Sequence, residues 1–196
     1  MTFERAMVIL FTKVAQTVIA ERFTHTFFDN DGNRVRKVFA YLFSVFIAIF
    51  VNLFFHKPIF NFLSIFLGLS AIALSYNGTI KRKCMFVFYI LAVSCLIDLV
   101  VSAFLIKPFG YDGYSAFVSI FALLLLHAAQ LITERFFGND LGIELNNRYW
   151  LFIIASLLVC IITSIVIFMD KTVSSFSLSL VCGAFLLVNI IISYLM

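Results

Sequence analysis

The chain has 196 residues, of which 63% are hydrophobic and 12% are charged, and it carries a formal net charge of +4. A soluble domain of this length cannot bury so much apolar surface, so the composition excludes a soluble globular protein. The basic residues lie in short stretches between apolar runs and form no basic face, which argues against binding to nucleic acid. We therefore predict a single all-α domain over residues 1–196, a polytopic transmembrane helix bundle with six to seven spans.

The first predicted helix, residues 3–27, carries polar side chains along one face. Its members recur at spacings of three and four residues and are Lys13, Gln16, Thr17, Ala20, Glu21 and Thr24. Two placements are open for such a helix. It is either a span that turns its polar stripe into the bundle or an amphipathic helix on the cytoplasmic surface, and we favour the span.

Six further apolar segments are each long enough to cross a hydrocarbon core of about 30 Å. Turn residues and cations separate them, and Pro58 suits the first turn of a helix. The predicted segments are residues 38–56, 58–76, 84–106, 114–134, 149–169 and 172–196.

Three consecutive cations, Lys81, Arg82 and Lys83, set the predicted orientation in the membrane. Lys and Arg close to the ends of spans are retained on the cytoplasmic side, so the loop that holds this triplet lies inside. Counting from it places the C-terminus in the cytoplasm, and with seven spans the N-terminus lies outside. The cations of the inner loops are Arg34, Arg36, Lys37, Lys81, Arg82, Lys83, Arg135 and Arg148, against Arg5, Lys57, Lys107 and Lys171 outside.

Asp98 is the residue that costs most to place in a membrane, because it lies well inside the predicted span of residues 84–106. Ser94 and Ser102 share its helix face and form a polar strip that is open toward the outside. Two roles are open for Asp98: recognition of a ligand, or a structural hydrogen-bonding group. His127, in the predicted span of residues 114–134, is expected to face the bundle and bond to a neighbour, with a proton relay as the alternative.

Polar and aromatic residues are predicted to gather at the outer rim of the bundle. Such a rim suits a small or peptidic ligand, although interfacial anchoring explains Lys and Tyr equally well. With Asp98 and Ser102, the candidate ligand-binding residues are Asn52, His56, Asn61 and Tyr111.

The last predicted span carries a heptad-like seam of mostly small residues. Small residues let helix backbones approach closely and a buried Asn fixes register, so the seam predicts a two-fold dimer interface, with packing inside one bundle as the alternative. Its members include Ser175, Ser179, Cys182, Asn189 and Ser193.

No nucleotide-binding, hydrolase or zinc-protease motif occurs in the chain, so we predict no catalytic residue, no metal site and no cofactor. Two rival functions remain open. One is a small transporter or immunity-type membrane protein. The other is a peptide-processing membrane cysteine peptidase, for which Cys84 and His25 both fall at the cytoplasmic face, although a thiolate needs its base within hydrogen-bond reach.

Several short signatures together resemble the membrane-sensor half of the Agr-type quorum-sensing receptor histidine kinases of low-GC bacteria, whose other half is a GHKL-type ATPase. These signatures are the aromatic-acidic end of the first helix, a cation-rich turn, the end of the second span, the loop with the basic triplet and the closing helix. They read Phe27-Phe28-Asp29, residues 29–37, Asn52-Leu53-Phe54-Phe55, residues 76–83 and residues 187–195.

The resemblance implies a receptor in the bacterial cytoplasmic membrane that binds a peptide pheromone from outside. It also implies that the last helix passes the signal to a dimeric cytoplasmic kinase, as part of a two-component system. The phosphorylated-histidine helix and the ATPase domain of the family have no counterpart in this sequence, so we expect a homodimeric sensor without kinase activity of its own. The expected partners are the lipid bilayer, an extracellular peptide and a second copy of the chain.

Overall fold

The computed structural model describes residues 3–28, 33–55, 58–111 and 115–137, and over these residues the chain is helical and contains no strand. The predicted all-α class is thus confirmed for this part of the chain. The elements are α1 (Phe3–Phe27), α2 (Arg34–Phe54), α3 (Pro58–Ser75), α4 (Ile80–Val101), the π-helix η1 (Ser102–Ile106), α5 (Lys107–Phe109) and α6 (Ala116–Phe137).

Two helices begin about one turn earlier than predicted, because cations are good helix formers and the residues before them are capping residues. In α2 the side chain of Asn33 accepts a hydrogen bond from the backbone N–H of Val35 at 2.9 Å. In α4 the Oγ1 of Thr79 accepts one from the backbone N–H of Arg82 at 3.4 Å. The basic triplet therefore lies in the first turn of α4 and not in the preceding loop.

The predicted turn after residue 106 is partly helical. The chain passes from α4 through the π-helix η1 into α5, and Gly110, with a φ of 67°, ends the helical stretch. In an α-helix the ring of Pro108 would clash with the carbonyl four residues before it, that of Phe104. The wider π turn lies where that clash would occur, which gives a physical reason for it.

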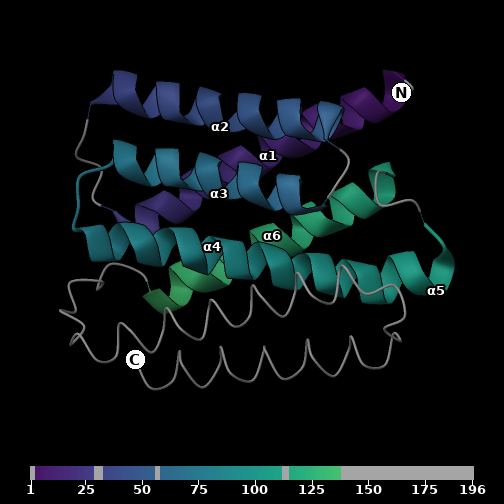
Figure 1. Ribbon diagram of the computed structural model, residues 1–196. Coiled ribbons are helices and arrows are strands. Elements are labelled where there is room, and N and C mark those ends of the chain that lie inside the picture. Colours follow the sequence, from purple (N-terminus) through teal and green to yellow (C-terminus); the bar gives the residue numbers. More distant parts are fainter. Residues whose placement is uncertain (1–2, 29–32, 56–57, 112–114, 138–196) are drawn as a thin grey trace.

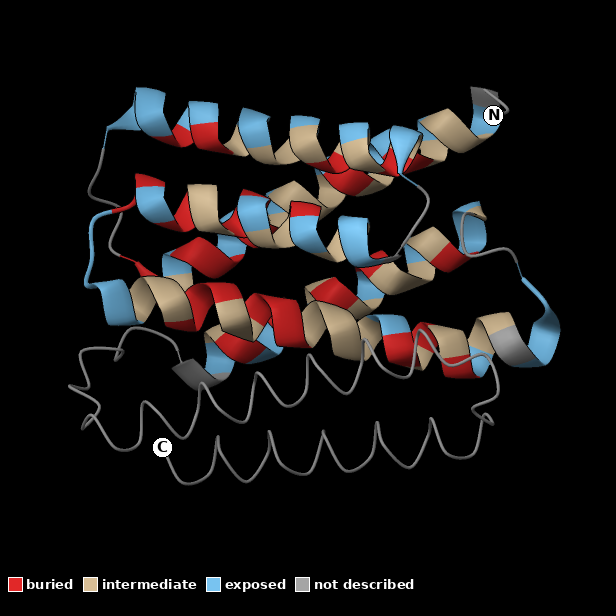
Figure 2. Cartoon of the chain, in the orientation of Figure 1, coloured by how far each residue is buried: buried red, intermediate tan, exposed pale blue. Residues whose placement is uncertain are grey.

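The five long helices lie side by side, and those next to each other in sequence run in opposite directions (Figure 1). Helix α4 packs against α3, α6 and α1, whereas α2 packs against α3 and α1. The burial pattern follows from these neighbours, because most positions in the middle of α4 are buried and most of α2 is accessible (Figure 2). The side chains of Phe39, Phe46 and Phe54 in α2 are each more than 60% exposed.

Three helical stretches are long and apolar enough to cross a membrane: Arg34–Phe54, Ile80–Ile106 and Ala116–Arg135. This is fewer than the six to seven spans predicted. Two of the missing spans, 149–169 and 172–196, lie outside the described residues. The other two are α1, which carries several charges, and α3, whose apolar stretch of Ile59–Ser75 is shorter.

Helix α1 turns part of its polar stripe into the bundle and several apolar residues outward, while Glu21 and Arg22 stay exposed. Lys13 and Thr24 are buried, with exposed fractions of 8% and 0%, while Phe11 and Val18 are 65% and 54% exposed.

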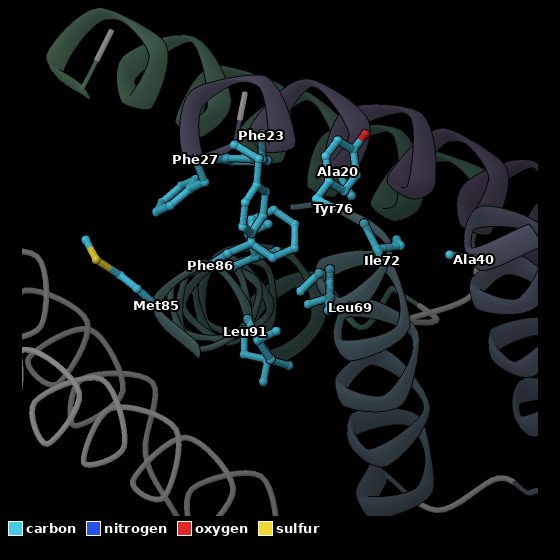
Figure 3. Packing of buried hydrophobic residues seen from close by; sticks show 14 of the residues in the cluster. Ala20, Phe23, Phe27, Ala40, Leu69, Ile72, Tyr76, Met85, Phe86 and Leu91 are labelled. Atoms are coloured by element: carbon cyan, nitrogen blue, oxygen red, sulfur yellow. The ribbon is translucent and has the colours of Figure 1, made fainter. Parts of the chain in front are cut away.

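A hydrophobic core joins α1, α3 and α4 near the end of the bundle where α1 finishes. The aromatic side chains there meet edge to face or tilted, which is the preferred geometry of aromatic pairs. The ring centroids of Phe27 and Phe86 lie 5.7 Å apart and those of Phe28 and Phe86 lie 5.3 Å apart. Figure 3 shows Phe23, Phe27 and Phe86 gathered between α1 and α4.

Candidate functional site

A polar cavity of about 110 Å³ lies between α1, α2, α3, α4 and α6. Each of the first four helices contributes at least one polar side chain to it, and α6 contributes only apolar ones. The polar lining residues are Lys13, Gln16, Thr17, Ser44, Asn61, Ser94 and Asp98. Most of the remaining wall is aliphatic, so the polar groups form a patch inside an otherwise apolar bundle.

Lys13 is the centre of a hydrogen-bond network in this cavity. Its ammonium group donates to Oε1 of Gln16 at 3.2 Å and to Oδ1 of Asn61 at 3.5 Å. The same Oδ1 of Asn61 accepts a bond from Nδ2 of Asn52 at 2.9 Å, and that Nδ2 also lies 2.8 Å from the carbonyl oxygen of Ala48. The network therefore ties α1, α2 and α3 together through one amide oxygen.

Asp98 supplies the opposite charge to the same cavity. A buried ammonium group is stable only when it is hydrogen-bonded and its charge is balanced. The attraction between Lys13 and Asp98 provides that balance. The two residues differ in access, because Lys13 is buried whereas Asp98 is exposed.

The structure brings together some of the predicted ligand-binding residues and separates others. Asp98 and Asn61 line the cavity, and Asn52 bonds to Asn61 from α2. Ser102 starts the π-helix outside the lining, and Tyr111 is exposed and packs against Phe117 with a centroid separation of 5.5 Å.

Other predicted residues either lie outside the described part of the chain or make no contact that supports the prediction. His56 and the predicted dimer seam of Ser175, Ser179, Cys182, Asn189 and Ser193 lie outside the described residues. His127 is half-buried. Between Cys84 and His25, both of which are described, there is no hydrogen bond, and within the described ranges no group of His, Cys, Asp and Glu is arranged to hold a metal ion.

The cavity residues that sequence reasoning did not assign to a site are Lys13, Gln16, Thr17 and Ser44. Three of them belong to the polar stripe of α1, which was the available signal. The sequence does not show which residues of other helices this stripe faces. The structure places it opposite Asn61 and Asp98.

A second polar cluster, the tyrosine cluster, lies at the C-terminal end of α1. It consists of Thr24, Lys37, Tyr41 and Tyr76. Oγ1 of Thr24 donates to the hydroxyl of Tyr76 at 3.0 Å, and the hydroxyls of Tyr41 and Tyr76 are also 3.0 Å apart. The ammonium group of Lys37 lies 4.2 Å from the centroid of the Tyr76 ring, and Phe28 stacks on that ring at 5.3 Å. This cluster fixes the ends of α1, α2 and α3 to one another.

Comparison with protein-family models, with curated proteins and with solved structures gave no significant match. The cavity offers one ammonium group, one carboxylate, amides and hydroxyls, without a paired nucleophile and base within the described residues.

Proposed function

We propose that this chain is a membrane-embedded sensor module, which receives a signal from outside the cell and relays it to the cytoplasm by a movement of its helices. The observation that carries the proposal is the polar cavity around Lys13 and Asp98, built inside a bundle whose outer surface is apolar. Ionisable groups in such a position are expensive and mark functional sites.

The two faces of α1 favour a span over a surface helix. A helix on the membrane surface turns its charged residues to water, whereas α1 turns Lys13 inward and Phe11 and Val18 outward. At 1.5 Å per residue the 18 residues of α3 reach about 27 Å, close to the thickness of the hydrocarbon core. With 149–169 and 172–196 included, the proposed bundle has seven spans.

The proposed orientation follows from the distribution of cations. The end of the bundle where α2 and α4 begin carries Arg34, Arg36 and the basic triplet, and this end is the cytoplasmic one under the positive-inside rule. The cavity then lies near mid-depth. The location that we propose is the cytoplasmic membrane of a bacterium, with a cytoplasmic C-terminus.

The resemblance to the sensor half of the Agr-type receptor kinases supports the same function. Under this proposal an extracellular peptide contacts the outer ends of the helices, including Tyr111, while the cavity distinguishes two arrangements of the bundle. The ligand acts by binding one arrangement more tightly than the other. The last helix, through Ser175 and Ser179, relays the change within a homodimer.

Oxidative crosslinking tests the relay. In a background whose other cysteines are replaced by Ser, Cys182 or a cysteine at Ser175 or Ser179 reports the separation of the last helices in a dimer. We expect the peptide fraction of spent medium from the source cells to change the crosslinked yield, and the same fraction after protease digestion to leave it unchanged. Crosslinks that form but do not respond to the peptide fraction contradict the sensor function.

A small transporter is the second candidate, and the observation that favours it is the presence of opposite charges in one cavity inside the bundle. Intramembrane charge pairs also line the pathways of pumps and carriers. Uptake of solute into proteoliposomes that is abolished in Asp98→Asn would favour transport over sensing.

A further inference from the structure

The cavity holds one buried positive group and one accessible negative group. The side chain of Lys13 is only 8% exposed, while Asp98 is exposed. Both charged groups line the same cavity, so a solute inside it meets an ammonium group and a carboxylate.

The ammonium group of Lys13 has a donor to spare. Lysine carries three N–H donors, and two are directed to Gln16 and Asn61. Among the described residues no acceptor receives the third. The hydroxyls of Thr17, Ser44 and Ser94 also line the space around it.

Size and charge together define what fits. A volume of about 110 Å³ is well below the roughly 300–1,000 Å³ of pockets that take drug-sized ligands, so a whole peptide or a lipid is too large. A simple anion is attracted by Lys13 but repelled by Asp98. A simple cation is attracted by Asp98 but repelled by Lys13. A small molecule with both charges satisfies both groups.

We propose that the cavity binds a small zwitterionic solute, with its carboxylate on Lys13 and its ammonium group on Asp98. Charge-assisted hydrogen bonds at both ends supply the affinity, and the hydroxyls of Ser44 and Ser94 add neutral contacts. This inference rests on the proposed function, because it names a chemical class of ligand that biases the sensor.

The test uses the full chain in lipid nanodiscs and a series of amino acids that differ in charge separation: glycine, β-alanine and γ-aminobutyrate. Saturable binding is measured by isothermal calorimetry and by the shift of the thermal unfolding midpoint. We expect one member of the series to bind most tightly, and acetate and methylammonium at the same concentration to leave the midpoint unchanged. Equal binding of acetate, or binding by no member of the series, overturns the proposal.

Matched variants locate the site. Lys13→Met and Asp98→Asn should each weaken binding at least about tenfold, since each removes one charge-assisted hydrogen bond. The controls are Lys37→Met, which removes an equally buried lysine from the tyrosine cluster, and Glu21→Gln, which removes an exposed carboxylate from α1. Both should bind as the parent chain does.

Two further outcomes remain interpretable. If a single variant fails to fold, the neutral double variant Lys13→Met with Asp98→Asn takes its place, because neither charge is left unpaired. Zwitterion binding that leaves the crosslinking of the last helix unchanged supports the site and contradicts the relay. Crosslinking that responds to the peptide fraction when no zwitterion binds supports the sensor and contradicts this ligand class.

Discussion

At the scale of single residues, Lys13 and Asp98 differ in burial. The free-energy cost of leaving each charge without its opposite charge therefore differs as well. Removing one of two opposite charges that balance each other leaves the other uncompensated, which costs about 3–5 kcal/mol when that charge is fully buried. Lys13 is the buried member and Asp98 the accessible one. The cost of losing the pair therefore depends on which side chain is removed.

Asp98→Leu should lower the free energy of unfolding more than Lys13→Leu does. The first variant leaves a buried ammonium group without its opposite charge, whereas the second leaves a carboxylate whose side chain is exposed. The double variant should recover part of the loss, because an apolar pair replaces the ionic one. Thermal unfolding in detergent measures all three, and equal losses in the two single variants would contradict the assignment of burial.

Gln130 is a buried polar residue that makes no hydrogen bond within the described part of the chain. Its side chain is 0% exposed, and neither Nε2 nor Oε1 has a partner there. An unsatisfied buried polar group costs about 1–3 kcal/mol. Gln130→Leu should therefore raise the thermal unfolding midpoint, while the matched variant Gln16→Leu, which removes an acceptor of Lys13, should lower it. A lower midpoint for Gln130→Leu would mean that its amide has a partner.

At the scale of helix pairs, α2 and α3 pack closely at Gly68. A Cβ added there would overlap Oγ of Ser44 and would lie 3.1 Å from Cβ of the same serine. Small residues at such positions let helix backbones pack at short range. The pair Gly68 and Ser44 is thus the contact point of the hairpin formed by these two helices.

Gly68→Ala should destabilise the chain by about 1–3 kcal/mol, the usual cost of overpacking. Ser44→Gly in the same chain removes the atoms that the new methyl group would meet, so it should restore much of the loss. Unfolding midpoints of the two single variants and the double variant provide the measurement. Additive losses in the double variant would show that Ser44 is not the residue in the way.

Two substitutions of Tyr76 in the tyrosine cluster separate the contribution of its hydroxyl hydrogen bonds to stability from that of its ring. Tyr76→Phe removes the bonds to Thr24 and Tyr41 but keeps the ring beneath Lys37 and against Phe28. We expect a loss of about 1–2 kcal/mol in the free energy of unfolding for Tyr76→Phe. Tyr76→Leu should lose more, since the stacked and cation–π contacts disappear as well. Equal losses would assign the whole effect to the hydroxyl.

Much of the helical architecture was predictable because hydrophobic runs and their interruptions are local features. The bounds 3–27 of the first helix agree with α1, and the predicted start at residue 58 agrees with α3. The helix starts at Arg34 and Ile80 were missed because capping by Asn33 and Thr79 carries cations into the first turn. Only part of the cavity was predictable from the sequence. The rotation of α1 that points Lys13 at Asn61 depends on contacts between helices, which are not local features.

At the scale of the whole molecule, α2 and α4 begin with cations and have no acidic residue in their first turns. This is the unfavourable sign for the positive end of a helix dipole, at a cost of roughly 0.3–1 kcal/mol per charge. Both helices begin at the same end of the bundle (Figure 1). A cost repeated at one end of the molecule is explained when those cations fix orientation in the membrane instead of stabilising the helices.

Reporter fusions test this explanation of the cations. A reporter enzyme that is active only outside the cell should be inactive when fused after Tyr76 and active when fused after Lys107, because α4 and the helical turns that follow it lie between the two sites. Neutralising the triplet by Lys81→Gln, Arg82→Gln and Lys83→Gln should give activity at both sites in a mixed population. The matched variant Arg5→Gln, at the proposed outer end, should leave the pattern intact. Activity after Tyr76 in the parent chain would contradict the proposed orientation and place the basic triplet outside the cell.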